Sequence, residues 1–173
     1  MRLVGFAAGM CAVLALAGCS DAVDGQPEAS GAPPAKEQLF DPCTVPDSVL
    51  IAAGADPASK DDNPFSVPRA DWKGCGWRAG EFFIDLFSTT NTMDEFRDNR
   101  LLHDFQDVAI EDRKGVQYLI GETSPPEECG LAFESSRGTI TLQSSRASSS
   151  KSTTDPCVVV NNAAPHFIAT FPK

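Results

Sequence analysis

The sequence predicts an α+β domain in which a few helices pack on an antiparallel sheet, and three observations lead to this. Short segments with apolar residues at the strand period occur in pairs, and turn residues separate the two members of each pair. Such segments outnumber the helical ones. Four of the six cysteines lie beyond residue 40, where two disulfides can staple these elements together. Strands that follow one another through tight turns favour an antiparallel sheet.

The first eighteen residues have the pattern of a lipoprotein signal peptide. Arg2 precedes an uncharged stretch at 3–17, which is shorter than the roughly 20 residues of a membrane-spanning helix. The stretch leads into the sequence LAGC, in which small residues stand directly before Cys19. We expect residues 1–18 to be removed and Cys19 to be acylated. The alternatives are ordinary secretion with a cut elsewhere, or an uncleaved anchor.

Acylation would hold the protein on the extracytoplasmic face of the cell membrane. Each buried CH₂ contributes about 0.8 kcal/mol, so two or more acyl chains anchor a protein stably. Loss of Arg2 leaves 13 cations against 24 acids, and the formal net charge changes from −10 to −11. This excess of acids argues against nucleic-acid binding, because neutralising phosphates requires cations. The expected partners are the bilayer, through acylated Cys19, and an envelope protein or small ligand.

Residues 19–39 are expected to form a disordered acylated tether, and 40–173 a single extracytoplasmic α+β domain. The tether is rich in Ala, Gly, Pro and Ser, and Val23 is its only large apolar residue before position 39. Such a stretch buries too little apolar surface to offset the entropy lost on ordering. Large apolar residues return at Phe40.

The first half of the domain contains one expected helix and one expected hairpin. A helix is predicted over 46–53, with Pro in its first turn and Gly54 just beyond its end. Residues 56–71 are expected to form a long polar loop, because three prolines interrupt them. Segments 76–78 and 82–87 are predicted to be strands joined by a tight turn.

A second helix is predicted over 92–105, because Thr92 and Glu95 have the spacing of a capping box. Two further hairpins follow, since polar turn residues separate short apolar segments. Their paired strands are expected at 108–111 with 116–120, and at 131–134 with 139–143.

The end of the chain is expected to be an exposed loop followed by a helix. Residues 144–154 are rich in serine, which is typical of a loop. A helix is predicted over 157–164, with Asp155 as N-cap and Pro156 in the first turn. Pro165 is expected to kink or break it.

Four cysteines in an oxidising compartment are expected to form disulfides. Three connectivities are possible, and we favour the pairs that are neighbours in sequence, Cys43–Cys75 and Cys129–Cys157. Each closes a loop of about 30 residues, which the chain-entropy model equates with about 3.5 kcal/mol. The competing zinc site is disfavoured, because no CxxC pair occurs and the spacings are long.

Chemistry-bearing motifs are absent from the sequence. It contains no GxSxG, HExxH, Walker-type loop or GxGxxG. His103 is expected on the solvated side of the predicted helix, and His166 at the surface next to Pro165. The acidic pairs at 61–62 and 127–128 are expected to be solvated. We therefore expect no catalytic residue, no metal and no cofactor.

Two tryptophans flank the second cysteine of the domain. Trp77 lies in a predicted strand next to a disulfide and is expected in the core, as are Phe82, Phe83 and Phe87. Trp72 precedes that strand and is the aromatic residue expected to line a ligand groove.

The cysteine-containing segments resemble a known family. The sequence has DPC at 41–43, CGW at 75–77, Cys129 before a strand and a second DPC at 155–157. This order is similar to that of the domain of unknown function 3558 family, which consists of actinobacterial lipoproteins. The resemblance spans 40–173 and implies a sheet-and-helix fold similar to the Mog1/PsbP-like domains. It implies no established activity and no catalytic residues.

These observations lead us to expect a membrane-anchored envelope lipoprotein that is not an enzyme and binds a protein partner or an envelope ligand. One alternative is an envelope hydrolase with a carboxylate-based site, and another is an accessory or sensor subunit of a membrane complex. Binding predicts a concave apolar patch lined by aromatic residues. An enzyme predicts a cleft with carboxyl groups of perturbed pKa or a buried histidine.

Overall fold

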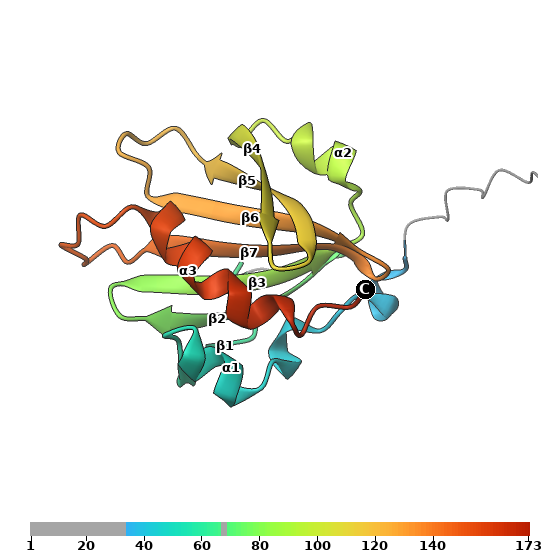
Figure 1. Ribbon diagram of the computed structural model, residues 1–173, viewed down its shortest axis with the longest axis horizontal. Coiled ribbons are helices and arrows are strands. Elements are labelled where there is room, and N and C mark those ends of the chain that lie inside the picture. The colour runs from blue at the N-terminus through green and yellow to red at the C-terminus, as the bar shows by residue number, and fades with distance from the viewer. Residues whose placement is uncertain (1–33, 67–68) are drawn as a thin grey trace, which may run out of the picture. The chain divides into compact units, whose positions relative to one another are not determined.

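The computed structural model describes residues 34–66 and 69–173 (Figure 1). The predicted signal peptide at 1–18, the acylation of Cys19 and most of the predicted tether lie outside the described residues. Among the residues that are described, no helix combines the length and hydrophobicity needed to cross a membrane.

A seven-stranded open sheet forms the body of the domain, and all its neighbouring strands are antiparallel. The spatial order is β1-β2-β3-β7-β6-β5-β4, so β1 and β4 are the edges. The strands are β1 (Asp56–Asp61), β2 (Trp72–Ala79), β3 (Phe82–Thr89), β4 (Leu102–Ile110), β5 (Arg113–Ile120), β6 (Glu128–Ser135) and β7 (Gly138–Arg146). The three predicted hairpins are confirmed as β2–β3, β4–β5 and β6–β7, each with longer strands than expected.

The predicted helix over 92–105 is wrong beyond its first turn. The capping box is present, because Thr92 Oγ1 accepts a hydrogen bond from Glu95 N at 3.2 Å and Glu95 Oε2 accepts one from Thr92 N at 2.9 Å. The helix α2 nevertheless covers only Met93–Arg97. The following residues form β4, which pairs with β5. Hydrogen bonding to a neighbouring strand therefore outweighs the helical preference of this segment.

Two segments expected to be loops contain strand residues. β1 lies within the predicted loop at 56–71 and is an edge strand with an irregular register, a position in which a proline such as Pro57 is tolerated. β7 extends into the predicted loop at 144–154. There Ser144 is buried, and its Oγ donates a hydrogen bond to the carbonyl oxygen of Pro156 at 2.6 Å.

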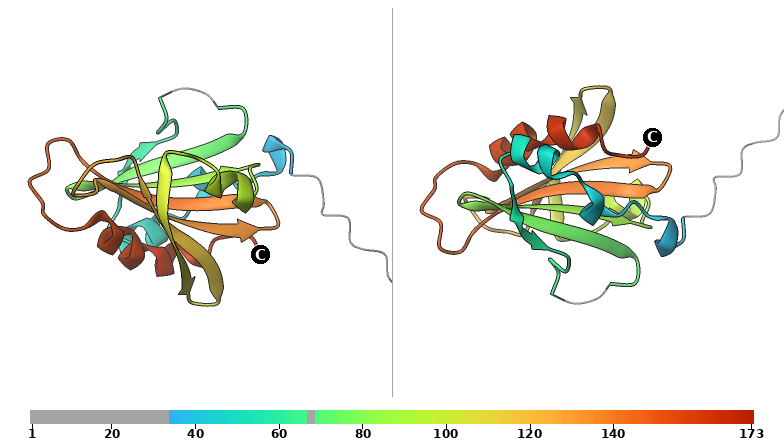
Figure 2. Two further views of the ribbon diagram at one scale, coloured as in Figure 1. Left: turned by 90° about the horizontal axis from the view of Figure 1, so that it is seen from above. Right: turned by 90° about the horizontal axis from the view of Figure 1, so that it is seen from below.

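Two helices, α1 (Asp47–Ala52) and α3 (Pro156–Ile168), lie together on one side of the sheet (Figures 1 and 2). The predicted break at Pro165 is absent, since α3 continues through it. Pro165 is on the exposed side of α3, whereas Phe167 and Ile168 beyond it are buried. Burial of these two side chains keeps the last turn helical despite the missing backbone donor.

The main core fills the space between the sheet and these two helices. Trp77 is 1% exposed there, which confirms its predicted place in the core. Phe82 and Phe87 are also buried, whereas Phe83 is 37% exposed and the core prediction is wrong for it. Leu39, at the end of the predicted tether, is fully buried. Packed structure therefore begins before Phe40.

Both predicted disulfides are present. Cys43–Cys75 joins a short 3-10 turn (Pro42–Thr44) to β2, and Cys129–Cys157 joins β6 to the first turn of α3. Their Cα atoms are 5.2 Å and 5.0 Å apart, within the usual range for disulfides. Each bridge ties a peripheral segment to the sheet.

Candidate ligand-binding cleft

The sheet has a second face, opposite α3, which carries a different set of side chains. Successive residues of a strand point to opposite faces. Ile84 and Leu86 of β3 belong to the main core, so Asp85 and Phe87 lie on the second face. Figure 2 shows segments 62–66 and 69–71 on this side of the sheet, away from α1 and α3. The second face is therefore partly walled and partly open.

A cavity of about 350 Å³ lies on the second face, and we call it the cleft. Its floor is polar and comes from three strands: Asp85 (β3), Glu128 (β6), and Gln143 and Ser145 (β7). This volume falls within the range of small-molecule pockets.

Aromatic and aliphatic side chains form the walls of the cleft. On one side, Phe65 and Phe87 are stacked with ring centroids 4.3 Å apart, and Trp72 meets both rings edge-on, at 5.7 Å and 6.1 Å. On the other side lie residues that include Phe96 and Ile120. Trp72 therefore lines the cleft, which is the position that its predicted role requires.

A second cavity of about 500 Å³ adjoins the cleft. Pro64, Phe65, Arg69 and Trp72 line both cavities. The side chains around Trp72 thus separate two hollows. The carboxyl groups of the cleft, Asp85 and Glu128, are partly buried, whereas those of the second cavity, Asp41 and Asp62, are exposed.

Glycines on neighbouring strands create the room for this floor. A Cβ atom at Gly76 would collide with Asp85 Oδ1, and one at Gly130 would collide with the ring of Tyr118. These glycines are the cross-strand partners of Asp85 and Tyr118. A glycine inside a strand weakens the strand and often marks a close approach. Here it lets a polar side chain lie flat against the sheet.

The carboxyl group of Asp85 is held in its neutral form up to an unusually high pH. Burial, together with smaller contributions from the negative charges of Glu128 and Asp61, raises its pKa to about 7. Burial also raises the pKa of Glu128, with a smaller contribution from Glu127. The expectation that 127–128 is a fully solvated acidic pair is therefore wrong for Glu128, which is half-buried.

Positive charge does not compensate these two acids. In the described part of the chain, no ion pair within 4 Å includes Asp85 or Glu128. The nearby polar contact is between neutral groups: Gln143 Nε2 donates a hydrogen bond to the hydroxyl oxygen of Tyr118 at 2.9 Å. Burial raises the pKa of Tyr118, which therefore stays protonated.

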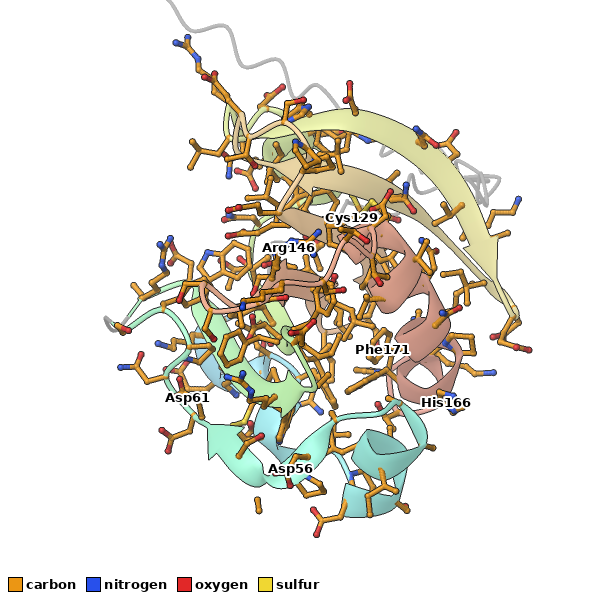
Figure 3. The ribbon with its side chains drawn as sticks, turned by 90° about the vertical axis from the view of Figure 1, so that its left-hand side faces the viewer. Asp56, Asp61, Cys129, Arg146, His166 and Phe171 are labelled. Carbon is orange, nitrogen blue, oxygen red and sulfur yellow. A yellow bond between two sulfur atoms is a disulfide. The ribbon has the colours of Figure 1, made fainter. Side chains whose placement is uncertain are left out.

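The two histidines and the acidic segment at 61–63 are not among the residues that line the cleft. His103 is exposed on β4, where its ring contacts the carbonyl oxygen of Gly121 at 2.5 Å. His166 is exposed on α3, and Figure 3 shows it far from Asp61 on β1. No group of three or more potential metal ligands occurs within 34–66 and 69–173.

Sequence reasoning missed the polar floor. Asp85 stands alone between apolar residues in the segment FFIDLF, and Gly76 and Gly130 sit inside strands. Each is a recognisable irregularity in a strand pattern. Their relation depends on sheet register, which places Gly76 of the same hairpin on one side of Asp85 and Gln143, from a segment distant in sequence, on the other.

Comparison with known proteins gives one match. The family described as "Protein of unknown function (DUF3558)" matches residues 14–170. No curated protein and no solved structure matches the chain.

Proposed function

The chain belongs to the DUF3558 family, whose function is unknown. From the cleft, we propose that the protein is an envelope lipoprotein that binds a small ligand without transforming it. The cleft carries this proposal. It combines aromatic walls with a few polar groups that form no ion pair with any residue within 34–66 and 69–173, a combination typical of ligand sites.

The location proposed for this domain is the outer side of the cell membrane, with Cys19 as the lipid anchor. The sequence LAGC behind an apolar stretch supports the anchor. Two disulfides agree with an oxidising compartment. We further propose that the antiparallel sheet is related to the Mog1/PsbP-like fold, which an experimental structure would test by superposition.

Membrane fractionation tests the anchor. Cys19→Ser should move the folded protein from the membrane fraction to the soluble fraction, because the thiol that carries the lipid is gone. Cys11→Ser is the matched control, since this cysteine lies within the segment expected to be removed, and it should leave the protein on the membrane. An unmodified Cys19 in the intact mass of the mature protein would contradict the proposal.

Retention of a ligand tests the cleft. Native mass spectrometry of the protein purified from membranes should detect a bound small molecule. Trp72→Ala should lose it, because this substitution removes an aromatic wall. Phe83→Ala is the control, since Phe83 is the exposed phenylalanine of β3 and does not line the cleft. Equal loss in both variants, or no bound molecule in the wild type, would count against the cleft as a binding site.

A carboxylate-based hydrolase is the second candidate, and one observation favours it. A carboxyl group with a pKa of about 7 in a cleft, such as that of Asp85, suits a general acid or base at neutral pH. The two candidates differ in turnover. Conversion of more than one equivalent of an envelope component, abolished by Asp85→Asn, would favour the hydrolase, and recovery of the ligand unchanged would favour binding.

A further inference from the structure

The charge in the cleft is unbalanced. Asp85 and Glu128 lie in its floor, and Arg69 is the only Lys or Arg among the described residues that line it. The guanidinium of Arg69 lies over the ring of Phe65, 4.3 Å from its centroid, and forms no ion pair with either acid. With both acids ionised, two negative charges thus face one positive charge at the wall.

The surroundings of these acids suit an organic cation better than a metal ion. Calcium requires six to eight oxygen ligands, and the residues described contain no cluster of three or more acids, histidines or cysteines that could hold a metal. The wall made by Phe65, Trp72 and Phe87 is aromatic. Aromatic faces attract ammonium and guanidinium groups, as Arg69 over Phe65 already shows.

We propose that the cleft binds a small organic cation, whose ammonium group lies against Asp85 and Glu128 while its apolar part packs on the Trp72 wall. This inference rests on the proposed binding function and names the class of ligand. The volume of about 350 Å³ limits the ligand to a small molecule. The acidic character of the whole chain, with a formal net charge of −10, favours the approach of cations.

Binding of a cation must be linked to proton release. The charged and titratable groups around Asp85 are Asp61 from β1, Tyr118 from β5, Glu128 from β6 and Arg69 at the wall, while β7 contributes only neutral side chains to the floor. The ionised form of Asp85 is the one that attracts a cation. With a pKa of about 7, Asp85 is largely neutral at pH 5.5 and largely ionised at pH 8. The affinity for a cation should therefore rise with pH, and the affinity for an anion should fall.

The test uses three aromatic probes of similar size and different charge: benzyltrimethylammonium, benzyl alcohol and phenylacetate. They are titrated into the acylated protein in nonionic detergent, and the NMR signals of its two tryptophan indoles are followed. Trp72 lines the cleft, whereas Trp77 is buried in the main core and serves as an internal control. Benzyltrimethylammonium should shift only the Trp72 signal. Its apparent affinity should be about 30-fold higher at pH 8 than at pH 5.5, if it binds only the form with ionised Asp85.

Two double variants distinguish the effect of the charges in the cleft on binding from the effect of the net charge of the protein. Asp85→Asn with Glu128→Gln should abolish both the binding and its pH dependence. Asp47→Asn with Asp112→Asn removes the same charge from two exposed sites that do not line the cleft, and should retain both. Thermal melting checks that the Asp85→Asn, Glu128→Gln protein folds, which we expect because it replaces partly buried acids by neutral groups of the same shape.

The outcomes distinguish the class of ligand from the existence of a binding site. If phenylacetate or benzyl alcohol shifts the Trp72 signal as strongly as the cation at pH 8, the ligand class is wrong and the binding function remains. If the cation binds equally well to the Asp85→Asn, Glu128→Gln protein, the acids do not select it and the inference fails. If none of the probes affects Trp72, the result counts against both the inference and the proposed function.

Discussion

At the scale of single residues, Asp85 shows how the two faces of one strand meet different demands. Its neighbours Ile84 and Leu86 are fully buried in the core, whereas Asp85 lies on the second face above Gly76. Burial without a cation makes ionisation costly, and this raises the pKa of the group to about 7. The folded protein therefore binds a proton at Asp85 that the unfolded chain releases near pH 4.

The first prediction concerns the stability of the fold at different pH values. The pKa of Asp85 is raised on folding, so this group costs the folded state least below pH 4. The free energy of unfolding then falls as the pH rises from about 4 through 7. Asp85→Asn should remove this loss and raise the free energy of unfolding at pH 8 by up to about 4 kcal/mol, with little change at pH 4. Urea unfolding at the two pH values measures it. Glu122→Gln, at an exposed site outside the helices and strands, should change neither value. An unchanged pH dependence in the Asp85 variant would contradict the assigned pKa.

At the scale of elements, the start of α3 depends on a local cap. Asp155 Oδ1 accepts a hydrogen bond from Cys157 N at 2.7 Å, and Pro156 occupies the first turn. The carboxylate satisfies one backbone donor that a helix start leaves without an intrahelical partner, and the proline has no such donor to satisfy. Arg146 of β7 adds a hydrogen bond to the carbonyl oxygen of Thr154 at 2.8 Å, which fixes the chain just before the cap.

The second prediction concerns the effect on stability of removing this cap. Asp155→Ala should lower the free energy of unfolding by about 1 kcal/mol, because one backbone donor at the helix start loses its acceptor. Thr153→Ala is the control. Thr153 is exposed in the preceding loop, and among the described contacts its side chain makes no hydrogen bond, so little change is expected. Chemical denaturation measures the free energy of unfolding of both variants. An equal decrease in the two would contradict a specific role for the cap.

At the scale of the whole molecule, the two faces of the sheet differ, since one carries the main core and the other carries the cleft. The main core contains Cys75 and Cys129, their disulfide partners pack against it, and α1 and α3 cover this side of the sheet. The second face has a smaller cluster around Phe96 and Tyr118, whose rings meet edge-on at 4.9 Å. A well-packed, cross-linked face can hold the sheet rigid while the opposite face keeps an open cleft.

The third prediction concerns the disulfides. Replacing Cys129 and Cys157 together by serine should lower the free energy of unfolding by about 3.5 kcal/mol, because the bridge no longer restricts the unfolded chain. Removing the other pair, Cys43 and Cys75, should have a similar effect, since the two bridges span 28 and 32 residues. Guanidinium unfolding under non-reducing conditions measures both. A loss below about 1 kcal/mol for either pair would show that the unfolded reference state is already restricted.

Local sequence by itself determined the hairpins and the helix caps. Turn residues between alternating apolar segments placed the hairpins, and Thr92, Glu95 and Asp155 marked the helix starts. These features depend on residues a few positions apart, so the chain carries their signal locally. The cysteine order, together with its DPC and CGW segments, also indicated the family that matches residues 14–170.

Only the tertiary structure decided how the remaining segments pair and where the acids meet. Residues 102–110 form β4 because β5 offers them a strand partner, and α3 continues past Pro165 because Phe167 and Ile168 find a core beyond it. Asp85 and Glu128 lie more than forty positions apart in sequence, and the register of β3, β7 and β6 brings them to one floor. The physical reason is the same in each case: pairing and burial between distant segments outweigh local preferences, which reach about 0.7 kcal/mol per ordinary residue and about 3 kcal/mol for a proline inside a helix.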